Sequence, residues 1–318
     1  MWTKEKYMKK QEHLSNKILI WTIYSVLIIY TLTILLTLIW GLMTSLKSNI
    51  DFLYGGNVLG FPKPSKSGDE LTKLKNYTLI LENFKFEKTV RFFSGSREIV
   101  HRADLDFFAL LYNTVLYAGG SCVLLAFVPL LMAYMCQKYP CKVSKIIYNV
   151  NLFVMILPIV GGTPATITLL RRLNLYDNFL GNFVLKFNFT GMYFFVYYAF
   201  FQGVSNAYIE AAEVDGASQL NIFVRIILPM AAKIAGTIML IQFISHWNDY
   251  NVPLLYLPTK PTLAYGVFHM VIINSSGPLS KVPIKVAGCM VLALPILTVF
   301  IILKEKLMGN ISLGGLKE

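Results

Sequence analysis

Uncharged stretches long enough to cross a lipid bilayer recur along this chain, and they restrict its fold more than any other property. The first runs from Ile18 to Leu46, which is 29 residues without a Lys, Arg, Asp, Glu or His. About 20 apolar residues in a helix cross the roughly 30 Å of hydrocarbon. Only 14% of the chain is charged, against roughly 25% in soluble domains. We therefore expect a membrane protein.

Lipid offers no hydrogen bonds, so each spanning segment must bond its own backbone groups, as a helix does. The first stretch is too long for the apolar core of a signal peptide, and no small-residue cleavage site follows it, so we expect it to be retained. The predicted class is an all-α membrane protein with six transmembrane helices. The predicted spans are Ile18–Leu46, Phe107–Cys136, Ile146–Leu170, Phe187–Val204, Ile234–Leu257 and Val286–Leu303.

The chain has a net charge of +12, and its clusters of lysine lie on one side of the predicted spans. The basic clusters are Lys4, Lys6, Lys9, Lys10 and Lys17, then Lys138, Lys142 and Lys145, and finally Lys304 and Lys306. Cytoplasmic loops carry such an excess, so both termini are expected in the cytoplasm. The basic excess then reflects topology and anionic lipid, and it does not indicate nucleic acid. The predicted parts are a cytoplasmic N-terminus (1–17), a first helix (18–46), an external loop (47–106), a five-helix core (107–303) with a cytoplasmic loop at 205–233, and a cytoplasmic tail (304–318).

Motifs for hydrolysis, nucleotide binding and metal binding are missing from the sequence. It has no G-x-x-x-x-G-K-[ST] phosphate loop, no H-E-x-x-H, no G-x-S-x-G and no paired-cysteine zinc pattern. The four cysteines are predicted to be reduced thiols, because they lie within spans, at span ends or in a basic loop. These are Cys122, Cys136, Cys141 and Cys289. We expect no catalytic residue, cofactor or metal in this chain, and we do not expect an enzyme.

The predicted spans contain few ionisable groups. His246 and Asp249 are three residues apart in the fifth span, so they share a helix face. Such a pair is either a proton site or a satisfied polar contact. Ion-coupled carriers keep charges at mid-membrane, and this scarcity favours a transporter whose energy comes from elsewhere. A secondary carrier stays as the less favoured alternative.

A polar, helix-forming segment at 208–229 separates two of the apolar stretches. It begins with strong helix formers around Glu210, and Gly216 then allows the left-handed turn that ends a helix. Ser218 is positioned to cap a second helix, and Pro229 is expected to mark the turn into the fifth span. We expect the small alanines to face outward, where another protein can approach. The segment is either a docking element or an ordinary amphipathic connection.

Several stretches resemble the permease subunits of bacterial ABC importers. Glu210-Ala211-Ala212, Gly216 and Ile226-Ile227-Leu228-Pro229 resemble the E-A-A motif of that family. Other stretches are similar to its carbohydrate-uptake branch, in particular to the second maltose permease type: Asn113-Thr114, Ala133-Tyr134, Leu157-Pro158, Trp247-Asn248-Asp249-Tyr250, Pro253–Leu257, Thr262-Leu263 and the glycine-rich tail at 309–317. The chain departs from the family in a longer external loop and in a tail that ends Leu316-Lys317-Glu318, where the family favours Val-Lys-Gly.

The resemblance implies a bacterial inner-membrane permease with a cytoplasmic coupling helix. It implies a second permease subunit, an ATPase dimer that binds ATP and Mg²⁺, an external solute-binding protein and membrane lipid as partners. The implied site residues fall into three groups. The ATPase-coupling residues are Glu210, Ala211, Ala212, Asp215 and Gly216; the candidate pathway residues are Trp247, Asn248 and Asp249; the candidate tail contacts with the ATPase are Gly309, Gly314 and Lys317.

The resemblance also implies the activity: closure of the ATPase dimer moves the 208–229 segment and switches the pathway between inward-open and outward-open. The expected solutes are sugars or oligosaccharides. An ABC permease for an amino acid, a peptide or a polyamine is the alternative within the same family.

Overall fold

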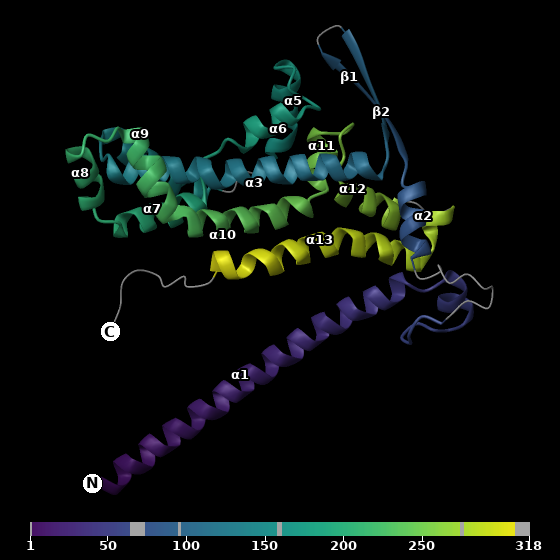
Figure 1. Ribbon diagram of the computed structural model, residues 1–318, viewed down its shortest axis with the longest axis horizontal. Coiled ribbons are helices and arrows are strands. Elements are labelled where there is room, and N and C mark those ends of the chain that lie inside the picture. Colours follow the sequence, from purple (N-terminus) through teal and green to yellow (C-terminus); the bar gives the residue numbers. More distant parts are fainter. Residues whose placement is uncertain (1, 64–73, 95–96, 158–160, 274–276, 309–318) are drawn as a thin grey trace. The chain divides into compact units, whose positions relative to one another are not determined.

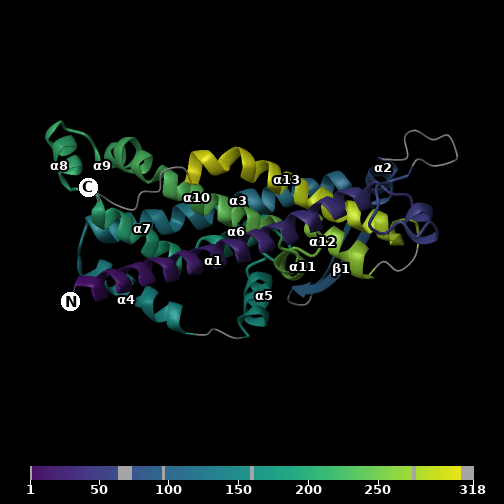
Figure 2. The same cartoon turned by 90° about the horizontal axis from the view of Figure 1, so that it is seen from below.

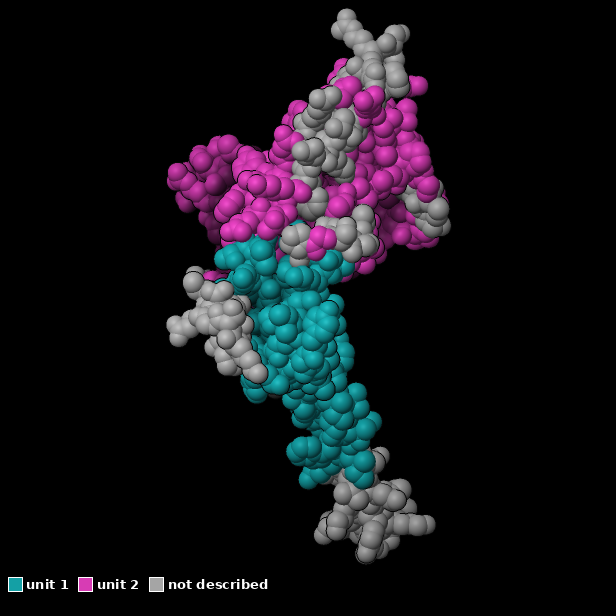
Figure 3. Space-filling view, turned by 90° about the vertical axis from the view of Figure 1, so that its right-hand side faces the viewer, with its two compact units in different colours: residues 1–79, 278–290 teal, residues 80–277, 291–318 magenta. Residues whose placement is uncertain are grey.

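The computed structural model describes residues 2–63, 74–94, 97–157, 161–273 and 277–308. These residues divide into two compact units, which Figure 3 shows in different colours. Unit 1 comprises Met1–Leu79 and Pro278–Met290, and unit 2 comprises Ile80–Gly277 and Val291–Glu318.

Four helical stretches of the described residues are long and apolar enough to cross a membrane. They are Asn16–Ser45, Phe107–Lys138, Gln219–Trp247 and Val282–Lys304. The all-α membrane class predicted from the sequence is confirmed, since helices dominate the described chain.

Unit 1 is built around one long helix, α1 (Trp2–Ser45), which precedes the π-turn η1 (Ile50–Tyr54). The chain after α1 is held close to its end by the buried side chain of Lys47, whose Nζ donates to the carbonyls of Asn57 and Val58 at 2.8 and 2.9 Å. Asn76, in the first turn of α2 (Lys75–Asn83), donates to the carbonyls of Ser45 and Lys47. The remaining parts of unit 1 are η5 (Pro278–Ser280) and the start of α13 (Val282–Met308).

Unit 2 contains the other elements, which run in chain order from a hairpin through a helical bundle. They are β1 (Phe86–Ser94), β2 (Arg97–Leu105), α3 (Phe107–Lys138), α4 (Lys142–Ile156), α5 (Gly162–Arg172), α6 (Phe179–Lys186), α7 (Met192–Gly203), α8 (Ala207–Val214), α9 (Gln219–Ile222), η3 (Phe223–Ile227), α10 (Leu228–Trp247), α11 (Asn251–Tyr256), α12 (Leu263–Phe268) and η4 (His269–Ile273).

The core of unit 2 lies between α3, α7 and α10, which run side by side in Figures 1 and 2. Small residues of α3 and α10, such as Ala126 and Ala231, let the helices approach closely, and aromatic residues of α7 fill the remaining space. Phe194, Tyr197 and Phe201 of α7 are fully buried. These aromatic rings are therefore packing residues of the bundle.

The predicted external loop at 47–106 contains regular structure that the sequence did not predict. β1 and β2 pair in antiparallel register, from Phe86 opposite Leu105 to Ser94 opposite Arg97. After this hairpin, the Asp106 side chain accepts a hydrogen bond from the amide of Ala109 at 2.8 Å and caps the start of α3.

The third and fourth predicted spans are shorter helices than the run of apolar residues indicated. The stretch at 146–170 is divided between α4 and α5, because α4 ends where Leu157 adopts the extended conformation that a following proline favours. The stretch at 187–204 forms the 12-residue α7, whose length of about 18 Å is less than the hydrocarbon thickness. Apolar composition alone did not reveal these interruptions.

Candidate coupling site

The polar segment predicted to dock a partner forms two short helices at one end of the unit 2 bundle. α8 (Ala207–Val214) and α9 (Gln219–Ile222) lie at the same end of α3 in Figure 1. Ile209 and Ala212 of α8 and Ile222 of α9 are buried in the same core cluster as the three long helices. The segment is therefore packed into the bundle and is no loose connection.

Gly216 ends α8 in the way that the sequence predicts. Its φ is +78°, in the left-handed region where glycine has no Cβ penalty. The amide of Gly216 donates to the carbonyl of Glu213, and the amide of Ala217 donates to the carbonyl of Ala212, both at 2.9 Å. This pair of bonds is the glycine C-cap that reverses the chain after a helix.

The second helix begins at the predicted cap but runs on further than predicted. The Ser218 side chain accepts a hydrogen bond from the amide of Asn221 at 3.4 Å. α9 then continues through η3 into α10, so residues 219–247 form one helical stretch. The expectation that Pro229 marks a turn is wrong, because Pro229 lies in α10, within this continuous helical stretch.

The alanines of the segment do not both face outward, as the sequence was expected to place them. Ala212 is 8% exposed and packs inward beside Ile209, three residues earlier on the same helix face. Glu210, Ala211 and Asp215 are exposed. The outward surface is thus acidic, and of the adjacent pair Ala211 and Ala212 only Ala211 belongs to it.

Large apolar side chains accompany the acidic groups on the outward surface of the segment. Val214 is 88% exposed and Leu220 is 72% exposed, and Tyr208 is also exposed. Exposed apolar side chains rimmed by polar groups are typical of protein interaction sites. The acidic and apolar surface of α8 and α9 is therefore the candidate docking surface.

Asp249, one of the candidate pathway residues, lies just beyond the end of α10 and connects three elements. Its carboxylate accepts a hydrogen bond from the Tyr117 hydroxyl of α3 at 2.6 Å. It also accepts from the backbone amides of Asn251 and Val252, at 3.0 and 3.1 Å, at the start of α11. These three donors compensate the cost of holding the charge in a half-buried site.

The neighbouring residues of Asp249 have structural contacts of their own. His246 bonds through Nδ1 to the carbonyl of Gln242 at 2.8 Å, and its ring lies 5.5 Å from that of Tyr117. Within the described chain, the structure records no hydrogen bond from His246 to Asp249. The indole of Trp247 is buried and donates to the carbonyl of Leu292 in α13 at 3.0 Å, while Asn248 is exposed.

Two long-range contacts in unit 2 have no signal in the sequence pattern. One is Tyr117, whose bond to Asp249 joins residues 132 positions apart. The other is Asp177, which is buried and accepts from the amide of Thr259 at 3.0 Å. Each contact joins segments far apart in the chain, so only the tertiary fold reveals it.

The proposed tail contacts Gly309, Gly314 and Lys317 lie outside the described residues. In the part of the chain that the structure describes, no group of three or more His, Cys, Asp or Glu side chains is placed to bind a metal.

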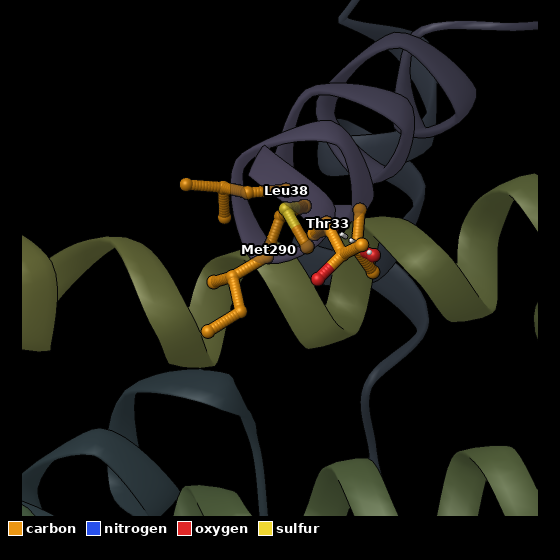
Figure 4. Close-up of a pocket in the computed structure, with 5 residues that line it drawn as sticks. Thr33, Leu38 and Met290 are labelled. Atoms are coloured by element: carbon orange, nitrogen blue, oxygen red, sulfur yellow. Dashed lines mark hydrogen bonds between the residues drawn. The ribbon is translucent and has the colours of Figure 1, made fainter. Parts of the chain in front are cut away.

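A shallow groove of about 380 Å³ on unit 1 is apolar apart from two hydroxyls (Figure 4). Its lining residues are Thr33, Ile34, Thr37, Leu38 and Met290. Both threonine hydroxyls are bonded to carbonyls of α1 itself, those of Tyr30 and Thr33. The groove therefore offers few polar groups to a sugar.

Comparison with known proteins gives consistent matches. The profile of the family described as "Binding-protein-dependent transport system inner membrane component" matches residues 123–307. The arabinooligosaccharides transport system permease protein AraQ of Bacillus subtilis (strain 168) is 22% identical over 66% of this chain and 74% of its own.

Two further similarities extend over nearly the whole chain. The probable starch degradation products transport system permease protein AmyC of Thermoanaerobacterium thermosulfurigenes is 25% identical over 90% of this chain and 95% of its own. A chain of a bacterial ABC transporter involved in the import of the acidic polysaccharide alginate superposes with a TM-score of 0.68, at 20% identity, over 92% of this chain and 97% of that chain. This last likeness supports the fold.

Proposed function

The chain belongs to the family of binding-protein-dependent transport system inner membrane components, and from that premise we propose that it is a permease subunit of an ATP-driven importer of sugars or oligosaccharides. As a member of this family it is an integral membrane protein and a transport component, and it is not an enzyme.

The curated relatives support the solute class. Three of the matched permeases are named for arabinooligosaccharides, for melibiose, raffinose and stachyose, and for starch degradation products. Amino acids, peptides and polyamines are therefore disfavoured as the solute.

The observation that carries the proposed mechanism is the geometry of α8 and α9. The inward side chains Ile209, Ala212 and Ile222 fix the segment to the bundle, and the outward side chains are acidic and apolar. A partner that moves this surface must therefore move the bundle with it. ATP-driven closure of a bound ATPase dimer would bias the permease between two states through this surface.

The proposed partners are a second permease subunit, an ATPase dimer that binds ATP and Mg²⁺, and an external solute-binding protein. The coupling residues are Glu210, Ala211, Ala212, Asp215 and Gly216, of which Ala212 acts from the buried side of α8. Both termini and the 205–233 segment are proposed to be cytoplasmic, and the 47–106 segment external.

The candidate pathway residues Trp247, Asn248 and Asp249 differ in exposure, and we propose different roles for them. Asp249 is half-buried beside Tyr117, and Asn248 is exposed, so both are available to line a pathway. Trp247 is buried and bonded to α13, so its proposed role is to hold these two residues in position. Their assignment is tested by measuring uptake after Asn248→Ala and Asp249→Asn.

The function is tested by uptake into proteoliposomes that contain the four-subunit importer with its binding protein. Radiolabelled maltotriose, arabinotriose and raffinose are supplied with ATP inside, and a matched preparation has a proton gradient without ATP. We expect ATP-dependent uptake of at least one oligosaccharide that also requires the binding protein. Uptake driven by the proton gradient alone would contradict the proposal and favour a secondary carrier.

A further inference from the structure

The start of α8 and the junction between α8 and α9 are tied to two consecutive residues at the end of α3. Lys138 is the last residue of α3, and Tyr139 is its C-cap. The segment is connected in sequence to α7 and α10, so these ties to α3 are an additional, tertiary attachment.

The first tie holds the start of α8. The Nζ of Lys138 donates to the carbonyl of Val204 and to Oδ1 of Asn206, the latter at 2.9 Å. Asn206 is the residue that immediately precedes α8. Lys138 therefore spans the junction between α7 and α8.

The second tie holds the end of α8 and the start of α9. The Tyr139 hydroxyl donates to Oε1 of Gln219, and Nε2 of the same Gln219 donates to Oε1 of Glu213 at 2.6 Å. Gln219 begins α9, and Glu213 lies in the last turn of α8. One side chain thus joins both short helices to the end of α3.

Tyr139 is itself held in place through both its side chain and its backbone. Its ring packs edge to face on Tyr134, with the ring centroids 5.8 Å apart, and the two hydroxyls are 3.3 Å apart. The Ser144 hydroxyl donates to the Tyr139 carbonyl at 2.9 Å. Tyr134 also packs on Phe201 of α7 and Phe223 of η3, with centroids 5.5 and 5.1 Å away. A side chain fixed in this way transmits displacement because it has little freedom to absorb it.

The opposite end of α3 contacts the segment around Asp249. Tyr117 donates to the Asp249 carboxylate at 2.6 Å, the Asn113 side chain donates to the carbonyl of Pro261 at 3.1 Å, and the amide of Leu263 donates to the Thr114 hydroxyl at 2.7 Å. α3 has 32 residues, which is a helix of about 48 Å. It connects the α8–α9 segment directly with the candidate pathway.

From these contacts we propose that Lys138 and Tyr139 are positioning residues that transmit movement of the α8–α9 segment to α3, and through α3 to Asp249. The proposal rests on the proposed function, because the movement originates in the ATPase. In this proposal α3 carries the movement, although it is α7 and α10, and not α3, that adjoin the segment in sequence.

The test uses the complete importer, with the ratio of solute transported to ATP hydrolysed as the readout. Tyr139→Phe keeps the ring on Tyr134 and removes the bond to Gln219, and Gln219→Met removes the same bond from an exposed position. We expect each variant to lower the ratio about 3- to 10-fold, the range that one hydrogen bond supports. Each variant also removes one further contact, the Gln219–Glu213 bond in Gln219→Met and the hydroxyl contact with Tyr134 in Tyr139→Phe. The double variant is expected to lose less than the sum of the two single losses, because the Tyr139–Gln219 bond is common to both.

The matched control is Tyr148→Phe. Tyr148 is also an aromatic residue beside α7, where it packs on Phe195 and Tyr198, and it has no tie to the α8–α9 segment among the hydrogen bonds of the described residues. The control is expected to keep the wild-type ratio. A merely structural loss would lower the amount of assembled importer and leave transport per ATP unchanged.

A wild-type ratio in both Tyr139→Phe and Gln219→Met would overturn the inference, as would fully additive losses in the double variant. These outcomes are distinct from failure of the proposed function. In that case the wild-type chain would neither copurify with an ATPase nor support ATP-dependent uptake.

Discussion

Replacement of Gly216 tests whether the turn between α8 and α9 controls transport through backbone geometry. A Cβ built at Gly216 has no atom within 4 Å, so added volume meets nothing within the chain. The whole cost of a substitution then comes from φ, which is +78°. A left-handed conformation costs a residue with a Cβ about 1–2 kcal/mol, with β-branched residues at the upper end and asparagine below it.

The expected order of transport follows from this difference in backbone cost. About 2 kcal/mol for Gly216→Val corresponds to a roughly 30-fold lower population of the native turn, because about 1.4 kcal/mol is a factor of ten. Gly216→Asn is expected to lose only a few-fold, and Gly216→Ala to lie between them. The assay is ATP-dependent uptake in proteoliposomes, normalised to the amount of permease in the membrane.

The alternative explanation for Gly216 is close approach of the ATPase, which side-chain volume would disturb. Volume places alanine ahead of asparagine, whereas backbone strain places asparagine ahead of alanine. Uptake by Gly216→Ala that exceeds uptake by Gly216→Asn would refute the backbone argument. Normal uptake by Gly216→Val would refute the coupling assignment as well.

Two further predictions concern other parts of unit 2. Gly181→Ala is expected to lower the apparent melting temperature of the purified importer, since the new Cβ would lie 2.0 Å from the Leu175 carbonyl oxygen. The matched control is Gly119→Ala, whose new Cβ would have no atom within 4 Å. This control should leave the melting temperature unchanged or raise it. Equal melting temperatures would contradict this packing. Hydrogen bonding from Ser144 lowers the pKa of the exposed Cys141 thiol, so Ser144→Ala should raise that pKa and reduce the thiolate fraction. Labelling of Cys141 by an impermeant maleimide at pH 7 in inside-out vesicles should therefore be slower in the variant, and the difference should vanish above the thiol pKa of both proteins. Labelling only in right-side-out vesicles would contradict a cytoplasmic 137–145 loop.

The sequence was most informative where local chemistry decides the structure. Gly216 and Ser218 adopt the predicted cap conformations, because a left-handed turn and an N-cap depend on the residue at that position. The end of α1 and both ends of α3 were also close to prediction, since uninterrupted apolar runs leave little choice in lipid. The start of α1 was not, because the helix begins at Trp2, within the polar residues before the predicted span.

The parts that were not predicted depend on tertiary contacts. The inward face of Ala212 is set by packing beside Ile209 against the bundle, and no local pattern distinguishes it from Ala211. The ties from Tyr139 to Gln219 and from Tyr117 to Asp249 cross 80 and 132 positions. Such pairs become visible only when the helices are placed together.

The central claim is that the outward surface of α8 and α9 is moved by a separate ATPase on the cytoplasmic side. Its most direct test is photo-crosslinking from a benzoylphenylalanine at Val214, which is 88% exposed on α8. The same probe at Leu59, which is 79% exposed in the 47–106 segment, is the control. The account predicts that Val214 crosslinks to the ATPase subunit in the assembled importer, with a yield that changes on ATP binding, and that Leu59 does not. Crosslinks from Val214 to an external protein, or to no ATPase in a transport-competent importer, would contradict it.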